Sequence, residues 1–141
     1  MSKFSTLNEV VKHSQSSKVL FVEDNLEIRE STVILLNELF DEVHIAVDGE
    51  DGLTQYRDFY KNNNSYFDIV ISDIRMPNLD GVALSKSIYN INQKQKIIII
   101  SAYNETEYLL PLINMGVNGF IQKPLSLEAI IEVLSPIYLK S

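Results

Sequence analysis

The stretch that decides the fold is Phe67-Asp-Ile-Val-Ile-Ser-Asp73, a short run of β-branched residues that ends in an acid. Residues 18–24 (Lys-Val-Leu-Phe-Val-Glu-Asp) and 96–101 (Lys-Ile-Ile-Ile-Ile-Ser) have the same form. Nearly continuous apolar runs of this length are typical of parallel strands that are covered on both faces. Residues 42–47 and 117–123 are two further candidate strands, and the alternating pattern of 42–47 favours an edge position.

The segments between these strands have the apolar spacing of amphipathic helices. The stripes are Ile28, Thr32, Leu35, Leu36 and Leu39; Leu53, Tyr56 and Tyr60; Leu84, Ile88 and Ile91; and Leu127, Ile130, Ile131 and Leu134. Strict alternation of strand and helix requires right-handed crossovers and a parallel sheet. The sequence therefore predicts an α/β fold, a doubly wound five-stranded parallel sheet with helices on both faces.

Length and composition exclude several classes of function. With 141 residues, 45% of them hydrophobic, the chain fits one compact domain and has no room for a second catalytic or DNA-binding domain. A formal charge of −7 disfavours direct binding to nucleic acid or to anionic membranes. The absence of Cys excludes disulfides, thiolate zinc sites and a cysteine nucleophile. Without a membrane-length apolar run or a signal peptide, we expect a soluble, cytoplasmic protein.

Residues 1–17 are interpreted as an N-terminal extension before a domain of residues 18–141. They are polar, with Phe4, Leu7, Val10 and Val11 at roughly helical spacing before the sequence Ser14-Gln-Ser-Ser17. This composition favours a frayed tail. A short amphipathic helix that packs on the domain or on a partner is the alternative.

Polar side chains follow the predicted strands where each strand ends: Glu23 and Asp24, Asp73, Ser101, and Lys123. The carboxyl ends of parallel strands share one edge of the sheet, so these groups should converge there. Three clustered carboxylates repel one another unless a cation is present, and hard oxygen ligands favour Mg²⁺, for which Mn²⁺ can substitute. Strand-end acids can instead cap the following helix, but that does not explain the whole set.

These residues resemble the response-regulator receiver domain of two-component signalling. The resemblance rests on Glu23-Asp24, on Asp73 followed by Met76-Pro77-Asn78-Leu79-Asp80-Gly81, on Ser101-Ala102, and on Lys123-Pro124. It covers residue 18 to about residue 139 and implies a flavodoxin-like fold with strand order 2-1-3-4-5. It also implies a phosphorelay signalling domain rather than an enzyme, one that catalyses only its own phosphoryl transfer and dephosphorylation.

The resemblance assigns the metal and the acceptor. Asp73 would accept a phosphoryl group from the phosphohistidine of a sensor histidine kinase or a phosphotransfer protein. Mg²⁺ would be held by Asp24 and Asp73, by the backbone carbonyl of Arg75 and, through water, by Glu23.

It also assigns the phosphoryl contacts and a switch. Lys123, the Ser101 hydroxyl and the backbone N–H of Ala102 would bind the phosphoryl oxygens. Phosphorylation would draw Ser101 inward, and Phe120 would fill the space that this opens. Because Phe has no hydroxyl, that switch would depend on ring packing alone.

The resemblance places the output surface on the fourth helix and fifth strand of the domain. If Ile113 is at the centre of the inward face, then Tyr108, Leu112 and Met115 face solvent and form a contact for a downstream effector or a homodimer. Pro111 lies inside that helix and should kink or shorten it. In the loop after Asp73, Gly81 is expected to accept a positive φ.

Three other functions were weighed. A phosphatase of the haloacid dehalogenase type needs an acid two residues after its nucleophile, where this chain has Arg75. A flavodoxin-like flavin carrier needs a hydroxyl- and Gly-rich phosphate loop after the first strand, where the acidic residues 23–27 would repel phosphate. A receiver that binds a partner without phosphorylation stays possible. The stimulus, the kinase, the output and the question of a stand-alone regulator or a piece of a longer protein stay open.

Overall fold

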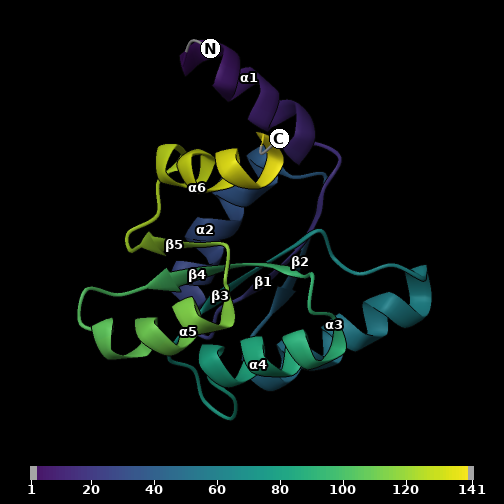
Figure 1. The fold of residues 1–141 in the computed structure, drawn as a ribbon, viewed down its shortest axis with the longest axis vertical. Coiled ribbons are helices and arrows are strands. Elements are labelled where there is room, and N and C mark those ends of the chain that lie inside the picture. Colours follow the sequence, from purple (N-terminus) through teal and green to yellow (C-terminus); the bar gives the residue numbers. More distant parts are fainter. Residues whose placement is uncertain (1–2, 140–141) are drawn as a thin grey trace.

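Five parallel strands form the centre of the molecule (Figure 1). The computed structural model describes the backbone of residues 3–139 and the side chains of residues 7–139. The strands are β1 (Lys18–Val22), β2 (Glu42–Ala46), β3 (Ile69–Asp73), β4 (Lys96–Ser101) and β5 (Gly119–Gln122). They pair in the order β2-β1-β3-β4-β5, which confirms the predicted sheet and places the alternating strand β2 at an edge.

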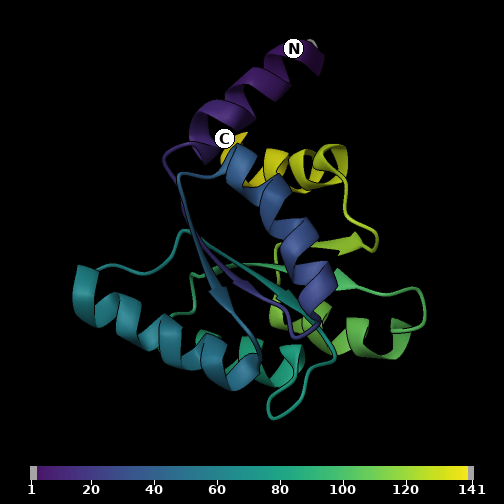
Figure 2. The same ribbon diagram turned by 180° about the vertical axis from the view of Figure 1, so that it is seen from behind.

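Helices cover both faces of the sheet, as predicted (Figures 1 and 2). They are α1 (Lys3–Ser14), α2 (Leu26–Leu39), α3 (Gly49–Asn63), α4 (Gly81–Ile91), the 3-10 turn η1 (Thr106–Tyr108), α5 (Leu109–Met115) and α6 (Leu127–Leu139). One core lies between the sheet and α2 with α6, and the other lies between the sheet and α3, α4 and α5. Alternate strand residues serve the two cores, so Phe21 and Ile71 face one while Leu20 and Val70 face the other. Among the described residues, no helix is long and apolar enough to cross a membrane.

Side chains begin three of the helices that follow strands. The side-chain oxygens of Asn25, Asp48 and Asp80 accept hydrogen bonds from the backbone N–H groups of Ile28, Asp51 and Ala83, at 3.0, 2.8 and 2.8 Å. Asn25, and not Asp24, is therefore the N-cap of α2. The capping explanation of the strand-end acid Asp24 is wrong, which leaves its carboxylate available for another role.

Residues 3–14 form a helix, so the interpretation of this segment as a frayed tail is wrong. Helix α1 lies beside α6 (Figure 2), and Val10 is completely buried. The ring of His13 stacks on Tyr138 of α6, with ring centroids 5.6 Å apart, and the Ser17 hydroxyl lies 2.6 Å from the Tyr138 hydroxyl. The side chain of Phe4 lies outside the described residues. The apolar spacing was a helix signal because α6 offers it a surface to bury against.

The loop after β3 approaches the strand end closely at Gly81. The N–H of Gly81 donates to the carbonyl of Ile74 at 2.6 Å, and a Cβ at Gly81 would lie 2.2 Å from the Asp73 carbonyl oxygen. Gly81 does not have a positive φ; the residue of this loop that does is Asn78, at 70°. The expected reason for Gly81 was wrong: it is needed because no side chain fits beside Asp73.

The predicted face of α5 is also wrong. Leu112 is completely buried, and Tyr108 and Met115 are half-buried against the core, whereas Ile113 is 55% exposed. The rotation of 100° per residue was extrapolated over a segment that is not one helix, because η1 occupies residues 106–108 and α5 begins only at Leu109. Pro111 lies in the first turn of α5, where a missing N–H costs little.

Candidate functional site

Four of the five strand-end side chains, those of Glu23, Asp24, Asp73 and Lys123, lie together at one edge of the sheet. One carboxylate oxygen of each of Glu23, Asp24 and Asp73 lies within 4.8 Å of the others. The ammonium Nζ of Lys123 lies 2.9 Å from Asp73 Oδ2 and 3.6 Å from Glu23 Oε1. Ser101 ends β4 next to β5, with Gln122 as its pairing partner. The parallel register therefore assembles acids from two strand ends and a cation from a third at one edge of the sheet.

The carboxylate of Asp73 is fixed from both sides. Its residue is 4% exposed at the end of the central strand β3. Oδ1 accepts the backbone N–H of Ile74 at 2.8 Å, and Oδ2 accepts the ammonium of Lys123. Lys123 is itself held at the end of β5, because its backbone N–H donates to the Ser101 carbonyl at 2.9 Å, and the Lys123–Pro124 peptide bond is cis. Asp73 is thus presented in one orientation beside a positive charge.

Glu23 is a buried acid whose positive partner, the Lys123 ammonium, lies 3.6 Å from its Oε1, beyond hydrogen-bond distance. It is completely buried, and its Oε2 accepts the N–H of Asn25 at 3.1 Å. Its Oε1 has no hydrogen bond within the described part of the chain. Burial, and then the negative charge of Asp73, raise the pKa of Glu23 to about 7. The negative charge of this carboxylate would be stabilised by a cation at the site.

The donor set fits a hard divalent cation. Three carboxylates on one edge supply oxygen ligands, and Asp24 is exposed and can be reached from solvent. The observation that points to a cation site, rather than to surface acids alone, is a fully buried Glu23 oxygen that accepts no hydrogen bond within the described residues. The Arg75 carbonyl follows in the loop after Asp73, and its part in metal binding stays a prediction.

Lys123 keeps its charge despite partial burial. Burial alone would lower the pKa of the ammonium, but the hydrogen bond and charge of Asp73 outweigh it, with further contributions from Glu23 and Glu105, so the pKa lies above its ordinary value. A compact cation that stays protonated beside Asp73 can neutralise an anionic oxygen. That is the role the sequence assigns to it.

The remaining predicted residues surround this centre. Ser101 is 7% exposed and directly precedes Ala102. Phe120 is half-buried and packs on the core that contains α4 and α5. Next to Lys123, a cavity of about 390 Å³ opens between Ala102 and the first turns of α2. Lys123 is thus one of the residues that line an open cavity.

Two residues of the site were missed by sequence reasoning. The guanidinium of Arg29 donates to the carbonyls of Glu23 at 3.0 Å and Asp24 at 3.3 Å, and so holds the loop after β1. The carboxylate of Glu105 accepts the backbone N–H of Ala102 at 2.6 Å. The position of Arg29 one turn into a helix was the available signal, but it does not differ from that of a solvated arginine. The sequence contained no signal for Glu105, because the backbone path of its loop cannot be predicted from hydrophobic periodicity.

Comparison with known proteins decides the family. Residues 19–135 match the model of the response regulator receiver domain. The chain belongs to this family. Receiver domains are signalling modules of two-component systems rather than classical enzymes; they bind Mg²⁺ and interact with histidine kinases and downstream effectors.

This receiver domain is similar to proteins of different overall lengths. It is 29% identical to a chemotaxis protein CheY of Treponema pallidum over 95% of this chain and 94% of that protein. It is 26% identical to the osmosensing histidine protein kinase SLN1 of Saccharomyces cerevisiae over 85% of this chain but only 10% of that protein. The CheY in a CheX-CheY-BeF3-Mg complex from Borrelia burgdorferi is 25% identical, with a TM-score of 0.79 over 96% of this chain and 99% of that one.

Proposed function

We propose that Asp73 of this receiver domain accepts a phosphoryl group from the phosphohistidine of a sensor kinase or a phosphotransfer protein. The observation that carries the proposal is the placement of the Asp73 carboxylate, buried at a strand end between the Ile74 N–H and the Lys123 ammonium. Two further carboxylates lie beside it. A carboxylate is a weak nucleophile, so positioning and electrostatic stabilisation must do most of the work.

The transfer exchanges one bond to phosphorus for another. A carboxylate oxygen of Asp73 attacks the phosphorus and forms an acyl phosphate, while the phosphorus–nitrogen bond of the phosphohistidine breaks and its electron pair returns to the imidazole. Lys123 must release Asp73 Oδ2 to some extent and pair with a phosphoryl oxygen instead. We expect the Ser101 hydroxyl and the Ala102 N–H to donate to the other phosphoryl oxygens.

Asp24 and Asp73, with the Arg75 carbonyl and, through water, Glu23, would hold Mg²⁺. When bound, the cation supplies positive charge that stabilises the transferring phosphoryl group. The Glu23 Oε1 that accepts no hydrogen bond within the described residues and the solved relative with BeF3 and Mg²⁺ support this assignment. Arg29 serves it indirectly by fixing the two peptide groups before Asn25.

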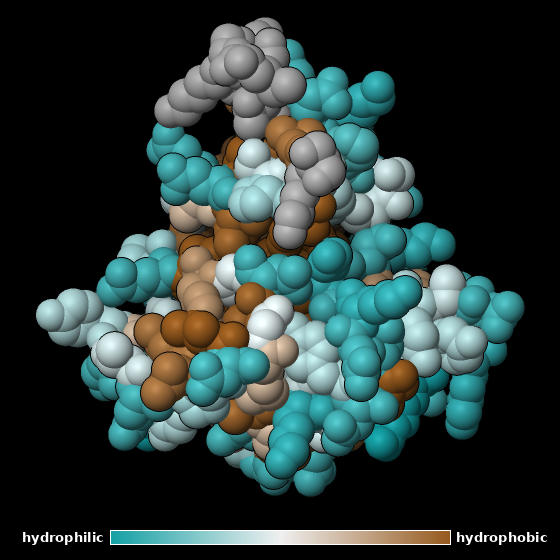
Figure 3. All heavy atoms as spheres, viewed as in Figure 1, coloured by the Kyte–Doolittle hydropathy of each residue, from teal (hydrophilic) through white to brown (hydrophobic). Residues whose placement is uncertain are grey.

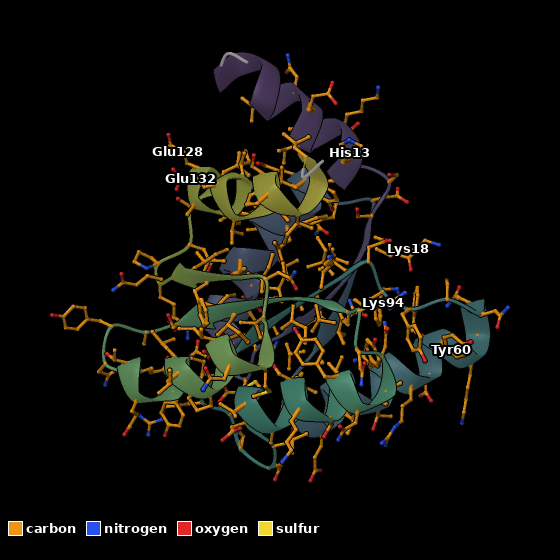
Figure 4. All side chains as sticks on the ribbon, viewed as in Figure 1. His13, Lys18, Tyr60, Lys94, Glu128 and Glu132 are labelled. Carbon is orange, nitrogen blue, oxygen red and sulfur yellow. The ribbon has the colours of Figure 1, made fainter. Side chains whose placement is uncertain are left out.

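The output is proposed to pass through Ser101 and Phe120 to α5. Phe120 packs on the same core as Leu112, so a shift of either the ring or Ser101 changes the support under α5. Leu110 and Ile113 are the large apolar residues that this helix exposes, at 64% and 55%. Figure 3 shows a hydrophobic patch on the surface over α5. They take the place of Tyr108, Leu112 and Met115 as the candidate contact for an effector or a second copy.

The test is phosphorylation by acetyl phosphate with Mg²⁺, followed by intact mass. The wild-type protein should gain one phosphoryl group, Asp73→Asn should gain none, and Asp58→Asn, which changes an exposed acid of α3, should behave like wild type. Failure of the wild-type protein, or modification of Asp73→Asn, would refute the proposal. The first of these outcomes would favour a receiver that binds its partner without phosphorylation.

A further inference from the structure

The carboxylate of Glu105 occupies a backbone donor that the proposed phosphoryl group needs. Glu105 lies in the loop between β4 and η1, is 4% exposed, and its Oε1 accepts the Ala102 N–H at 2.6 Å. It stands at the N-cap position of η1, yet its side chain does not cap that turn. The side chain turns back toward the strand end instead.

Glu105 also lies within electrostatic reach of the other donor. Burial lowers the pKa of Lys123, and the hydrogen bond and charge of Asp73 raise it. The negative charge of Glu105 also raises this pKa, by less than Asp73 does. The carboxylate therefore resembles a phosphoryl oxygen in two respects, since it is an anionic oxygen and it uses the Ala102 N–H. A buried carboxylate with so few partners is costly to keep, so it can be displaced by a better anion.

We propose that Glu105 is an internal competitor for the phosphoryl group, held in the site until phosphorylation displaces it. The inference rests on the proposed function, because it needs a phosphoryl group on Asp73. Two anions cannot share the Ala102 N–H, and their repulsion near Lys123 favours release of the weaker one into solvent.

Release of Glu105 changes the structure of the loop as well as its charge. The loop is closed by the Glu105 N–H, which donates to the Ala102 carbonyl at 3.2 Å, and the Glu105 carbonyl accepts the N–H of Tyr108 at 3.0 Å. The same residue thus joins the phosphoryl site to η1, which leads directly into α5. Displacement of its side chain loosens the turn on which α5 begins, so occupancy of the site is transmitted to that helix.

The test compares three variants in the rate of phosphorylation by acetyl phosphate with Mg²⁺. Glu105→Ala removes the competitor, and the initial rate should rise by at least about threefold, a modest part of the value of a charge-assisted hydrogen bond. Glu105→Gln keeps an acceptor without the charge and should give a smaller increase. Glu107→Ala changes an exposed acid two residues further on and should leave the rate unchanged.

A second readout examines the contact itself in the unphosphorylated protein. Hydrogen exchange of the Ala102 amide, followed by NMR, should be faster in Glu105→Ala than in wild type, and unchanged in Glu107→Ala. This measurement does not depend on phosphorylation. A protected Ala102 amide in Glu105→Ala would overturn the assigned contact and with it the proposal.

The outcomes separate this inference from the proposed function. If wild type takes no phosphoryl group, the proposed function fails and the inference falls with it. If wild type is phosphorylated and Glu105→Ala reacts no faster, only the inference is wrong. Should Glu105→Ala fail to fold by circular dichroism, Glu105→Gln decides, and an unchanged rate in that variant overturns the competitor role.

Discussion

Single residues of this receiver domain are held in states that a ligand would relieve. Glu23 is completely buried and one of its oxygens accepts no hydrogen bond within the described residues, and Glu105 is buried against a single backbone donor. Groups of this kind reduce the stability of the empty protein. A ligand that binds to these groups stabilises the folded state by more, so binding and folding are coupled at these residues.

The buried Glu23 predicts a pH dependence of stability in the absence of divalent ions. Below pH 4.5, Glu23 is protonated in both the folded and the unfolded chain. Between pH 4.5 and the folded pKa of about 7, the folded chain binds this proton more tightly than the unfolded chain does. The contribution of Glu23 to stability is therefore lost as the pH rises through this window. Glu23→Gln removes the effect, so its advantage over wild type in free energy of unfolding should be larger at pH 8 than at pH 4.5, by on the order of 3 kcal/mol.

Urea unfolding of both proteins at the two pH values provides the measurement, with Glu27→Gln as an exposed control on the first turn of α2. A difference between wild type and Glu23→Gln that does not change with pH would contradict the account of Glu23.

The parts of the site that could be predicted are those fixed by topology. Asp24, Asp73, Ser101 and Lys123 end strands or follow them, and any parallel sheet brings such residues to one edge. Glu105 lies in a loop, where contacts depend on the path of the backbone rather than on a repeating pattern. The reason for Gly81 was equally hidden, because a close approach to the Asp73 carbonyl is a three-dimensional fact.

At the scale of elements, α5 shows why helix existence is easier to predict than helix phase. The segment is apolar on most sides, with Leu109, Leu110, Leu112 and Ile113 in five residues, so periodicity alone does not choose its buried face. The 3-10 turn before it then shifts the start of the helix. Strands β1, β3 and β4 have no such ambiguity, because their continuous apolar runs are buried on both faces.

The corrected phase of α5 can be measured by a matched pair of substitutions. Leu112→Ala leaves a cavity in a completely buried position and should lower the free energy of unfolding by about 2 to 5 kcal/mol. Ile113 is 55% exposed, so Ile113→Ala should lower the free energy of unfolding by less than about 1 kcal/mol. Urea unfolding gives both values. The reverse order, with Ile113 the costlier position, would restore the original prediction for this helix.

In the molecule as a whole, the negative charge that gives the formal net charge of −7 is unevenly distributed. Three of the 19 acidic residues stand at one edge of the sheet, opposed by Lys123 and framed by the backbone donors of Ile74 and Ala102. Negative charge concentrated in this way attracts a divalent cation even though the molecule as a whole repels phosphate. Binding of the cation should therefore be measurable as an increase in the stability of the folded protein.

Mg²⁺ should stabilise the folded protein by mass action. At a concentration a hundred times the dissociation constant, it adds about 2.7 kcal/mol and raises Tm by on the order of 5 °C or more. Asp24→Asn should lose most of this increase, and Asp41→Asn, an exposed acid next to β2, should keep it. Thermal unfolding followed by circular dichroism with and without Mg²⁺ is the measurement, and an equal shift in Asp24→Asn and wild type would remove Asp24 from the metal site.

Asp73 is the residue that we propose carries the phosphoryl group. The most direct measurement is reduction of the phosphorylated protein with borohydride, which converts an aspartyl phosphate into homoserine, followed by sequencing of its peptides by tandem mass spectrometry. Homoserine is expected at position 73 after treatment with acetyl phosphate and Mg²⁺, and unmodified aspartate is expected there without acetyl phosphate. Homoserine at Asp24 or at any other acid, with Asp73 unchanged, would refute the assignment.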